Sequence, residues 1–475
     1  MTRHTLRLRS LVLFFGLLTI TTVAKAQSVP IDTLHAYGLY DADRLTPGFH
    51  AGRRAALLQK MHGHSVALFL AAPERTRAND VEYLYHQDPN FYYLTGHLES
   101  AAALLLSKDP ITLADGSQTH EVIFVQRRDP AQETWTGRRL GPQGANSVLG
   151  FAAAFKYDTL NAFLKPILEK TDTLFYTPNF ENTITDPTTD STVQIWATLK
   201  ATLLNRYPKL YNTNIRREMA VLRMVKQPEE LVLMRKSIAI SNKAHNEIIA
   251  HAKPGWHEYE MQALGEYIFT KNGAEYTGYP CIVGSGENST ILHYESNRRQ
   301  TVKGDFIEMD IGAEYHGYSA DITRSFPISG KFTQEQRLIY DLVLEAQDSG
   351  IRVSMVDSDF RAPHRAAVNV ITRGLFKLGI ITDSADYKKY FMHGTSHYLG
   401  LDVHDAGLYG KLEAGNVITV EPGIYIKAGS PCDKKWWNIG CRIEDDILIT
   451  PDGPEILSKA SPRKAVDVEE MMGRD

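Results

Sequence analysis

The 475-residue chain has few cysteines, only Cys281, Cys432 and Cys441, and it contains no Cys-x-x-Cys pair. So few thiols exclude a disulfide framework as the source of stability, and the missing pair excludes a zinc knuckle. Cys432 and Cys441 are close enough in sequence to pair across a loop, and the sequence leaves that pairing open. Otherwise we expect the three to be ordinary structural thiols.

Long apolar runs are also missing beyond the first 26 residues, so no later segment predicts a transmembrane helix. The single run, residues 11–24, follows three arginines, and Ala24-Lys25-Ala26 then supplies small residues at the two positions that a signal peptidase reads. This order predicts a signal peptide over residues 1–26, cleaved before Gln27, and an exported protein that is periplasmic or secreted. The alternative is an uncleaved anchor, although the run is short for a bilayer span of ~20 residues.

Excess positive charge is absent as well. The chain has 52 Lys and Arg against 56 Asp and Glu, a formal net charge of −4. Residues 1–26 carry four basic residues and no acid, so the mature chain has a charge of −4 − 4 = −8. This acidity argues against a nucleic-acid partner and against docking on anionic lipid.

The remaining residues are typical of an α/β (α+β) protein of two or three domains. Alternating helical and strand patterns predict an N-terminal α/β domain over residues 27–212, with the polar segment 211–214 as its junction. Its expected elements are helices at 53–61 and 196–205 and strands at 65–71, 101–107 and 121–125.

Residues 213–475 predict a second domain in which a helix–helix–strand order occurs twice, which hints at an internal duplication. Its expected elements are helices at 228–250, 258–272, 334–350 and 363–378 and strand-rich stretches at 280–326 and 417–450.

Within this domain, two β-like runs flank a short turn and predict a hairpin. If the turn centres between Tyr315 and His316, Asp310 lies opposite Asp321 on the partner strand. Two bare carboxylates at facing positions repel each other and weaken the sheet. A bound cation would convert that repulsion into a binding site.

Histidines accompany these carboxylates. His393, His397 and His404 fall within a short stretch, and His293 follows a glycine-rich loop in a position that suggests a substrate-facing imidazole. The spacing of His393 and His397 imitates H-E-x-x-H, but Gly394 replaces the glutamate, so a zincin helix is excluded. A single histidine is often structural, whereas three beside a carboxylate site favour a functional role.

Two further carboxylates complete the set. Glu421 ends an apolar run, and an unpaired buried carboxylate there would be unfavourable without a cation. Glu444 shares one strand face with Arg442 and Asp446. Four carboxylates and an imidazole are too many ligands for one small ion but suit two ions with bridging carboxylates. The five candidate ligands are Asp310, Asp321, His397, Glu421 and Glu444.

Taken in order, these motifs resemble the pita-bread metallopeptidases, and within them the aminopeptidase P (Xaa-Pro aminopeptidase) family. The resemblance covers essentially the whole mature chain, because N-terminal motifs contribute to it. The motifs lie at residues 72–80, 88–96, 135–141, 284–288, 309–312, 320–327, 393–397, 420–423 and 442–446.

The resemblance implies a fold and a chemistry. It implies a C-terminal pita-bread domain over residues 213–475 that binds two divalent ions, most often Mn²⁺, bridged by Asp321 and Glu444. A hard-oxygen site agrees with Mn²⁺, while ligand types leave zinc and cobalt open. The implied reaction is attack of a hydroxide held by the two ions on an Xaa-Pro bond, releasing the N-terminal residue of a peptide.

Residue roles follow from the same resemblance. Glu421 would also shuttle the proton, His404 would stabilise charge on the carbonyl oxygen, and His293 and His393 would line a proline pocket. The resemblance further implies a relay of Asp80, Tyr425 and Arg442 behind the metals. Trp135 and Arg139 would contact substrate from the N-terminal domain of a homo-oligomer, a dimer or tetramer.

Two rival functions remain at this stage. A prolidase, which cleaves Xaa-Pro dipeptides, has the same ligands, and sequence does not show how the site treats a free C-terminal carboxylate. A metal-free binding protein on the same fold predicts broken ligands, whereas all five are intact.

Overall fold

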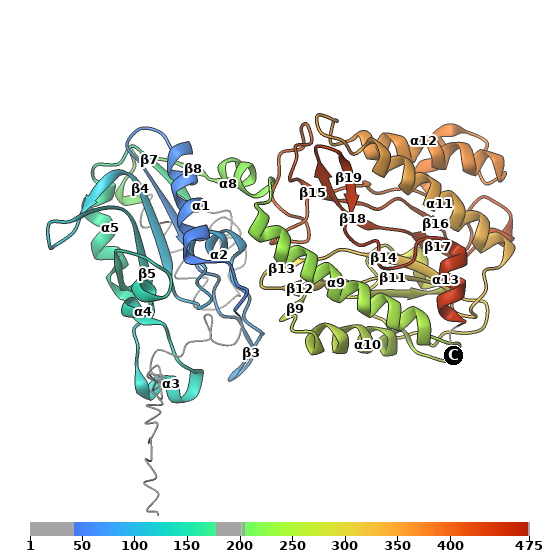
Figure 1. Cartoon of the computed structure of the whole chain (residues 1–475), viewed down its shortest axis with the longest axis horizontal. Coiled ribbons are helices and arrows are strands. Elements are labelled where there is room, and N and C mark those ends of the chain that lie inside the picture. Colours follow the sequence, from blue (N-terminus) through green and yellow to red (C-terminus); the bar gives the residue numbers. More distant parts are fainter. Residues whose placement is uncertain (1–41, 177–200, 202–204, 474–475) are drawn as a thin grey trace, which may run out of the picture.

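The structure is a computed structural model that describes residues 42–176, 201 and 205–473, and these residues form two lobes (Figure 1). The predicted signal peptide and all but two residues of the predicted helix at 196–205 lie outside the described residues. Within the described part of the chain, no helix is both long and apolar enough to cross a membrane.

The N-terminal lobe is built on one mixed six-stranded sheet, in the order β6-β5-β4-β1-β7-β8. The central strand β1 runs antiparallel to β4 and parallel to β7. The elements of the lobe are α1 (Pro47–Lys60), β1 (Ser65–Leu70), β2 (Thr76–Ala78), β3 (Val81–Glu82), α2 (Pro89–Thr95), β4 (Ala103–Thr112), β5 (Gln118–Val125), α3 (Pro130–Thr136), α4 (Gly141–Ser147), β6 (Ala154–Lys156), the 3₁₀ turn η2 (Tyr157–Thr159), α5 (Leu160–Leu168), β7 (Thr173–Tyr176) and β8 (Tyr211–Asn214).

Strand β1 has no polar face because both faces of the sheet are covered. All six of its residues are buried. Ala67 and Phe69 pack into the core that contains α1 and α2, while Val66 and Leu68 pack into a second core that contains α5. Alternate side chains of a strand point to opposite faces, so a strand covered on both sides reads as one continuous apolar run.

The predicted domain boundary after residue 212 falls inside a strand. Residues Tyr211–Asn214 form β8 and pair in parallel with β7, so the N-terminal sheet ends at Asn214. The segment is polar and turn-like in sequence, but β8 is an edge strand, where polar side chains are well tolerated. Helix α8 (Arg216–Arg223) follows at once and leads into the second lobe.

In the C-terminal lobe the strands lie between two helix pairs, α9 with α10 and α11 with α12 (Figure 1). This arrangement agrees with the repeated helix–helix–strand order expected from sequence. The elements are α9 (Pro228–His251), α10 (Glu258–Lys271), β9 (Tyr276–Thr277), β10 (Ile282–Ser285), η3 (Gly286–Thr290), β11 (Phe306–Asp310), β12 (Ala313–Tyr315), β13 (Tyr318–Ser319), β14 (Thr323–Pro327), α11 (Gln334–Val353), α12 (Ala362–Lys377), η4 (Ser384–Lys389), β15 (Val417–Val420), β16 (Gly423–Ile426), η5 (Lys434–Trp436), β17 (Ile439–Arg442), β18 (Asp445–Thr450), β19 (Gly453–Ile456) and α13 (Ala465–Met472).

Helices of this lobe begin at recognisable signals. Pro228 opens α9 directly after Gln227, whose backbone N–H donates to Glu230 at 2.8 Å. Thr333 and Gln336 form a reciprocal capping box at the start of α11. Such caps satisfy N–H groups that have no partner within the helix.

The register of the predicted hairpin needs a correction. Tyr315 pairs with Tyr318, so the turn centres between His316 and Gly317 rather than between Tyr315 and His316. These two residues have φ of 49° and 86°, and positive φ at both central positions is the requirement of a type I′ turn. Asp310 therefore pairs with Thr323, not with Asp321.

This shift in register keeps both aspartates on one face of the hairpin. It moves the register by two residues, and a strand repeats its side-chain direction every two residues. Asp310 and Asp321 therefore still belong to the same face, as diagonal rather than direct neighbours.

The tip of this hairpin is fastened to the N-terminal lobe. His316 contacts Glu275 at 2.6 Å through Nδ1 and Asp43 at 3.0 Å through Nε2. His86 of the N-terminal lobe contacts Glu314 at 2.8 Å. The base of the same hairpin carries the candidate ligands Asp310 and Asp321. One hairpin therefore connects the contact between the lobes to the site.

The three cysteines are free thiols in the structure. Cys281 and Cys441 are buried, and burial raises the pKa of the Cys441 thiol above its usual range. A raised pKa keeps the thiol protonated and unreactive. No disulfide joins Cys432 to Cys441 in this structure.

The pair of His86 and Glu314 gives a pH prediction. The hydrogen bond to Glu314 raises the pKa of His86 in the folded state. The stabilisation from this pair is then fully present below the unfolded-state pKa of about 6.5 and is lost as pH rises through the folded-state pKa. The destabilisation caused by His86→Gln should be largest near pH 6 and shrink towards pH 9.

Urea unfolding at several pH values measures the difference in the free energy of unfolding between the wild type and His86→Gln. We expect this difference to stay below about 1 kcal/mol, because the pair of His86 and Glu314 is partly exposed. In a Glu314→Gln background the pH trend of His86→Gln should vanish. A trend that persists there would mean that another group causes it.

Candidate metal centre

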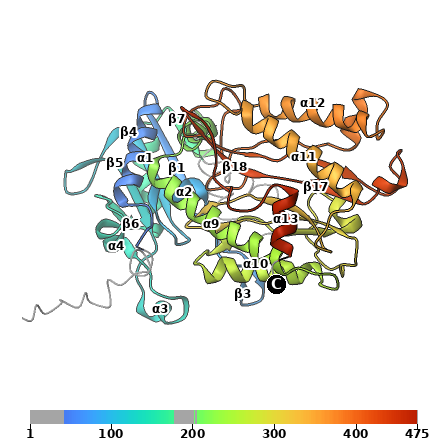
Figure 2. The same ribbon diagram turned by 45° about the vertical axis from the view of Figure 1, so that its right-hand side comes forward.

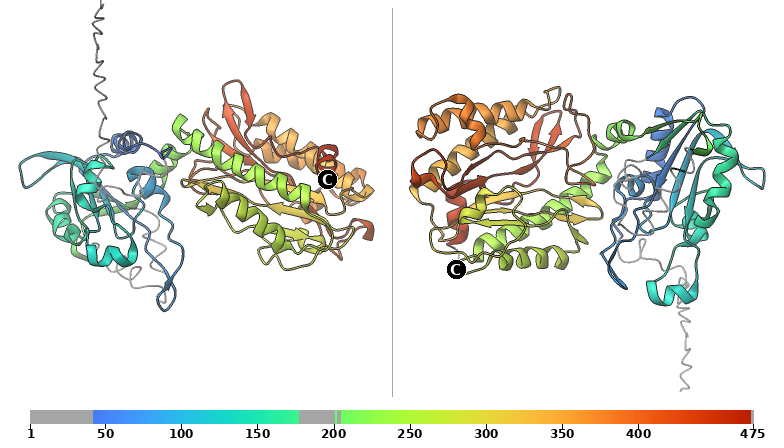
Figure 3. Two further views of the ribbon diagram at one scale, coloured as in Figure 1. Left: turned by 60° about the horizontal axis from the view of Figure 1, so that its bottom comes forward. Right: turned by 180° about the vertical axis from the view of Figure 1, so that it is seen from behind.

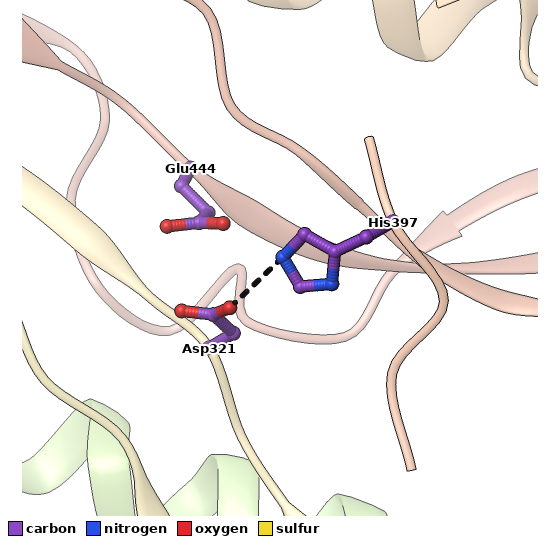
Figure 4. Close-up of side chains that lie close together, drawn as sticks. All are labelled: Asp321, His397 and Glu444. Carbon is purple, nitrogen blue, oxygen red and sulfur yellow. Dashed lines mark ion pairs between the residues drawn. The ribbon is translucent and has the colours of Figure 1, made fainter. Parts of the chain in front are cut away.

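Three of the five predicted ligands converge in the C-terminal lobe (Figure 4). Ligand atoms of Asp321, His397 and Glu444 all lie within 4.8 Å of one another. His397 Nε2 is 3.2 Å from Asp321 Oδ2. Asp321 precedes β14, Glu444 links β17 to β18, and His397 lies in a loop that follows η4, so three separate segments build the site.

Glu421 joins this cluster from the end of β15. Its Oε1 is 3.6 Å from His397 Nε2, and its Oε2 is 3.6 Å from His393 Nδ1. Its backbone N–H donates to the carbonyl of Thr395 at 2.9 Å, which fixes the start of the side chain. The two oxygens of Glu421 therefore face two different histidines.

Asp310 is connected to the cluster by hydrogen bonds through Arg442. Arg442 Nη2 donates to Asp310 Oδ2 at 2.7 Å and lies 2.5 Å from Glu308 Oε1. Arg442 Nη1 donates to the hydroxyl of Tyr425 at 2.8 Å. The predicted link between Arg442 and Tyr425 is thus present, and it holds Asp310 in place.

Three residues behind the ligands were not anticipated from sequence. Thr323 donates to Glu444 Oε2 at 2.6 Å and accepts from Arg442 Nε at 2.9 Å. Tyr279 donates to Asp310 Oδ1 at 2.5 Å. Glu308 and Thr323 each lie two residues from a candidate ligand on the same strand face, so strand periodicity contained a signal. Tyr279 has no such signal, because it comes from a different segment.

Buried negative charge dominates the electrostatics of the site. Burial, together with the charges of Asp321, Glu421 and Asp310, raises the pKa of Glu444 well above its ordinary value. Burial alone would lower the pKa of His397, but Asp321 and Glu421 raise it to about 9. A histidine that takes up a proton in this way indicates that the cluster requires additional positive charge.

The residues present fit a metal ion. Glu444 Oε1 is buried and has no hydrogen-bond partner in the described structure. An unpaired buried carboxylate oxygen is strongly unfavourable unless a cation binds it. The donor set, oxygen-rich with one imidazole, suits divalent ions that share carboxylate bridges.

His393 and His404 lie beside this cluster, whereas His293 is exposed in the segment that follows η3. The rings of His397 and His404 lie 4.1 Å apart between centroids. Burial and the charges of His397 and His293 lower the pKa of His404 to about 4. Burial likewise lowers the pKa of His393 to about 3, and its Nε2 lies 2.9 Å from the Tyr425 hydroxyl. His404 and His393 are therefore neutral at physiological pH.

Three predicted residues lie on the N-terminal lobe and away from these contacts. Asp80 is exposed in the turn between β2 and β3, and none of the interactions found among the described residues joins it to Tyr425 or Arg442. Of the relay expected from sequence, Tyr425 and Arg442 are therefore joined within one chain, and Asp80 is not. Trp135 is 87% exposed at the end of α3, which projects from the lobe (Figure 2), and Arg139 follows it.

Comparison with known proteins identifies the family of the chain. A model for metallopeptidase family M24 matches residues 232–451, and a model for the aminopeptidase P N-terminal domain matches residues 50–176. The Xaa-Pro aminopeptidase of Escherichia coli K12 is 38% identical over 439 residues, 88% of this chain and 96% of that protein. The chain belongs to the aminopeptidase P family of M24 metallopeptidases.

Other relatives in this family support the assignment. The Xaa-Pro aminopeptidase of Haemophilus influenzae is 35% identical and aligns with 88% of this chain and 96% of its own length. The solved structure of E. coli aminopeptidase P with the inhibitor Pro-Leu superposes with a TM-score of 0.80 at 36% identity, covering 90% of this chain and 98% of that one. The fold expected from sequence, an N-terminal α/β domain before a pita-bread domain, is confirmed.

Thr323 provides a test of this site. Because its hydroxyl orients both Glu444 and Arg442, Thr323→Val should weaken divalent metal binding by about 10-fold to 100-fold. Calorimetric titration of Mn²⁺ into the metal-stripped protein measures the affinity. Thr450→Val, at the end of β18, is the control and should leave it unchanged. Equal affinities for the wild type and Thr323→Val would show that the hydroxyl does not organise the ligands.

Proposed function

We propose that this metallopeptidase releases the N-terminal residue from peptides that carry proline at the second position. The observation that supports it best is the convergence of Asp321, His397 and Glu444 beside Glu421, in a chain related along nearly its whole length to Xaa-Pro aminopeptidases. Prolidase remains the alternative, and substrate length separates the two.

Two divalent ions are the proposed cofactors, held by Asp310, Asp321, His397, Glu421 and Glu444, with Mn²⁺ as the favoured ion. When bound, they supply Lewis acidity and lower the pKa of a water towards neutrality. Arg442 and Thr323 keep the carboxylates oriented, so less ligand motion is needed on binding.

Glu421 is the proposed proton carrier. Its Oε1 faces His397, which leaves Oε2, on the side of His393, to accept a proton from the attacking water. The same oxygen then delivers that proton to the leaving proline nitrogen. Transfer in both directions requires one carboxylate within reach of both positions. The backbone hydrogen bond of Glu421 to Thr395, which fixes the start of its side chain, supports this role.

His404 is proposed to stabilise the carbonyl oxygen as negative charge develops on it. Its lowered pKa keeps the ring neutral, so one ring nitrogen carries a proton that it can donate. A donor placed before the reaction needs no reorganisation in the transition state.

Selectivity for proline follows from the substrate. The nitrogen of an Xaa-Pro bond carries no hydrogen, so a peptidase that recognises an N–H at that position gains nothing. We propose that His293 and His393 instead line a pocket shaped for the pyrrolidine ring. The ring contact between Phe391 and His393, 5.1 Å between centroids, gives that wall an apolar character.

Export and assembly are further proposals. The basic, apolar and small-residue order of residues 1–26 supports cleavage before Gln27 and a periplasmic or secreted location. The exposure of Trp135 on a projecting helix supports a homo-oligomer, dimer or tetramer, in which Trp135 and Arg139 contact substrate bound to a neighbouring copy. Asp80, which is also exposed, would then complete the relay of Tyr425 and Arg442 in a neighbouring copy.

Substrate length and sequence give the decisive activity test. With Mn²⁺, the mature protein should cleave an Xaa-Pro-Yaa tripeptide faster than an Xaa-Pro dipeptide or a Met-Ala-Xaa peptide, and a chelator should abolish cleavage. Released amino acid, measured by chromatography, reports each rate. A preference for the dipeptide would assign a prolidase instead, and inactivity on all three peptides would contradict a peptidase.

Metal identity is tested separately. Metal-stripped protein reconstituted with Mn²⁺ should bind two ions and show higher kcat than with Zn²⁺ or Co²⁺, because four of the five ligands are carboxylates. Elemental analysis gives the stoichiometry beside the rate. Highest activity with Zn²⁺ would contradict the preference for Mn²⁺, and one bound ion at full activity would contradict the dimetal site.

A further inference from the structure

A buried cluster of charges lies directly beside the loop that carries His404. Its members, here called the Arg223 cluster, come from the segment between the two lobes and from both sides of His404. They are Arg223, Lys226, Asp402 and Asp405.

The contacts of the cluster are specific. Arg223 Nη2 donates to Asp402 at 2.8 Å and also to Asp405, and Lys226 Nζ donates to Asp405 Oδ2 at 2.6 Å. The side chains of Arg223, Lys226 and Asp405 are at most 3% exposed. Burial alone would raise the pKa of Asp405, but Arg223 and Lys226 lower it below its ordinary value, so the pair stays charged.

The loop is shaped around these charges. A Cβ on Gly400 would lie 2.2 Å from Asp405 Oδ2 and 2.8 Å from Lys226 Nζ, so the close approach requires glycine. The backbone of Asp405 donates to the carbonyl of Tyr398 at 2.8 Å, which closes the loop. His404 therefore lies between two aspartates that are both held by Arg223.

Arg223 also connects this loop to the N-terminal lobe. It is the last residue of α8, which lies between the lobes (Figure 3). Its Nη1 donates to Asn90 on α2 at 2.8 Å, and the hydroxyl of Tyr93 donates to the carbonyl of Leu222 at 2.9 Å. One guanidinium thus binds the N-terminal lobe and the loop of His404 at the same time.

We propose that Arg223 is a positioning residue for His404, and that through it the N-terminal lobe fixes the group that stabilises the carbonyl oxygen. This inference rests on the proposed function of His404. A guanidinium can bind two carboxylates in a fixed plane, so it sets the distance between Asp402 and Asp405 and with it the path of the chain between them. A buried charge network of this kind is retained for geometry more than for net stability.

A double-mutant cycle on kcat tests the proposal with an Xaa-Pro-Yaa peptide as substrate. Arg223→Met should lower kcat by about 10-fold to 100-fold with little change in KM, because a displaced His404 affects the transition state more than binding. In a His404→Ala background the same substitution should lower kcat by less than about twofold, since two residues that act through one interaction are not additive.

Controls separate positioning from general damage. Arg235→Met removes an arginine from an exposed pair with Glu455 and should leave kcat within about twofold of wild type. Metal content and thermal unfolding are measured for every variant. If Arg223→Met does not fold, Asp402→Asn replaces it, because Asp402 is partly exposed and its loss leaves the pair of Arg223 and Asp405 intact. We expect a smaller fall in kcat with the same non-additivity.

The outcomes are distinct. Equal losses of kcat from the cluster variant in the wild-type and His404→Ala backgrounds would overturn the positioning role while leaving the proposed function in place. A His404→Ala variant with full kcat would overturn the role of His404 and this inference with it. A wild-type protein inactive on the peptide would overturn the proposed function itself.

Discussion

Repulsion among buried carboxylates is the constraint on which the rest of this structure depends. Asp310, Asp321, Glu421 and Glu444 are brought together in one cluster. Burial and the neighbouring negative charges raise the pKa of Asp321, Glu421 and Glu444 and oppose their ionisation. Arg442 compensates one side of the group by binding Asp310 and lying beside Glu308. The remaining negative charge is what a pair of divalent cations would neutralise, so the same repulsion that weakens the fold creates the affinity for metal.

The N-terminal lobe contacts segments that carry site residues at two places. The β12–β13 hairpin carries candidate ligands at its base and is fastened at its tip by contacts that include His86 and Asp43. The Arg223 cluster binds the loop of His404 on one side and Asn90 on the other. The N-terminal lobe therefore contacts both the hairpin that carries two candidate ligands and the loop that carries His404.

Sequence reasoning was most successful where one local pattern decides the outcome. Helices at 228–250 and 334–350 were predicted nearly to their ends, because Pro228 and Thr333 are strong start signals. It failed where pairing decides. Residues 211–214 are polar enough to suggest a junction, yet they form β8 because β7 offers a partner. The hairpin register moved by two residues because positive φ falls on His316 and Gly317.

The candidate ligands, their order and the family could be read from the chain alone, because residue chemistry at fixed spacing is a local property. Which groups meet could be seen only in the folded chain. Tyr279 bonds Asp310, Thr323 joins Glu444 to Arg442, and Arg223 lies beside Asp405, although up to 182 positions separate such partners. No local pattern specifies a contact between distant segments, because it depends on how whole elements pack.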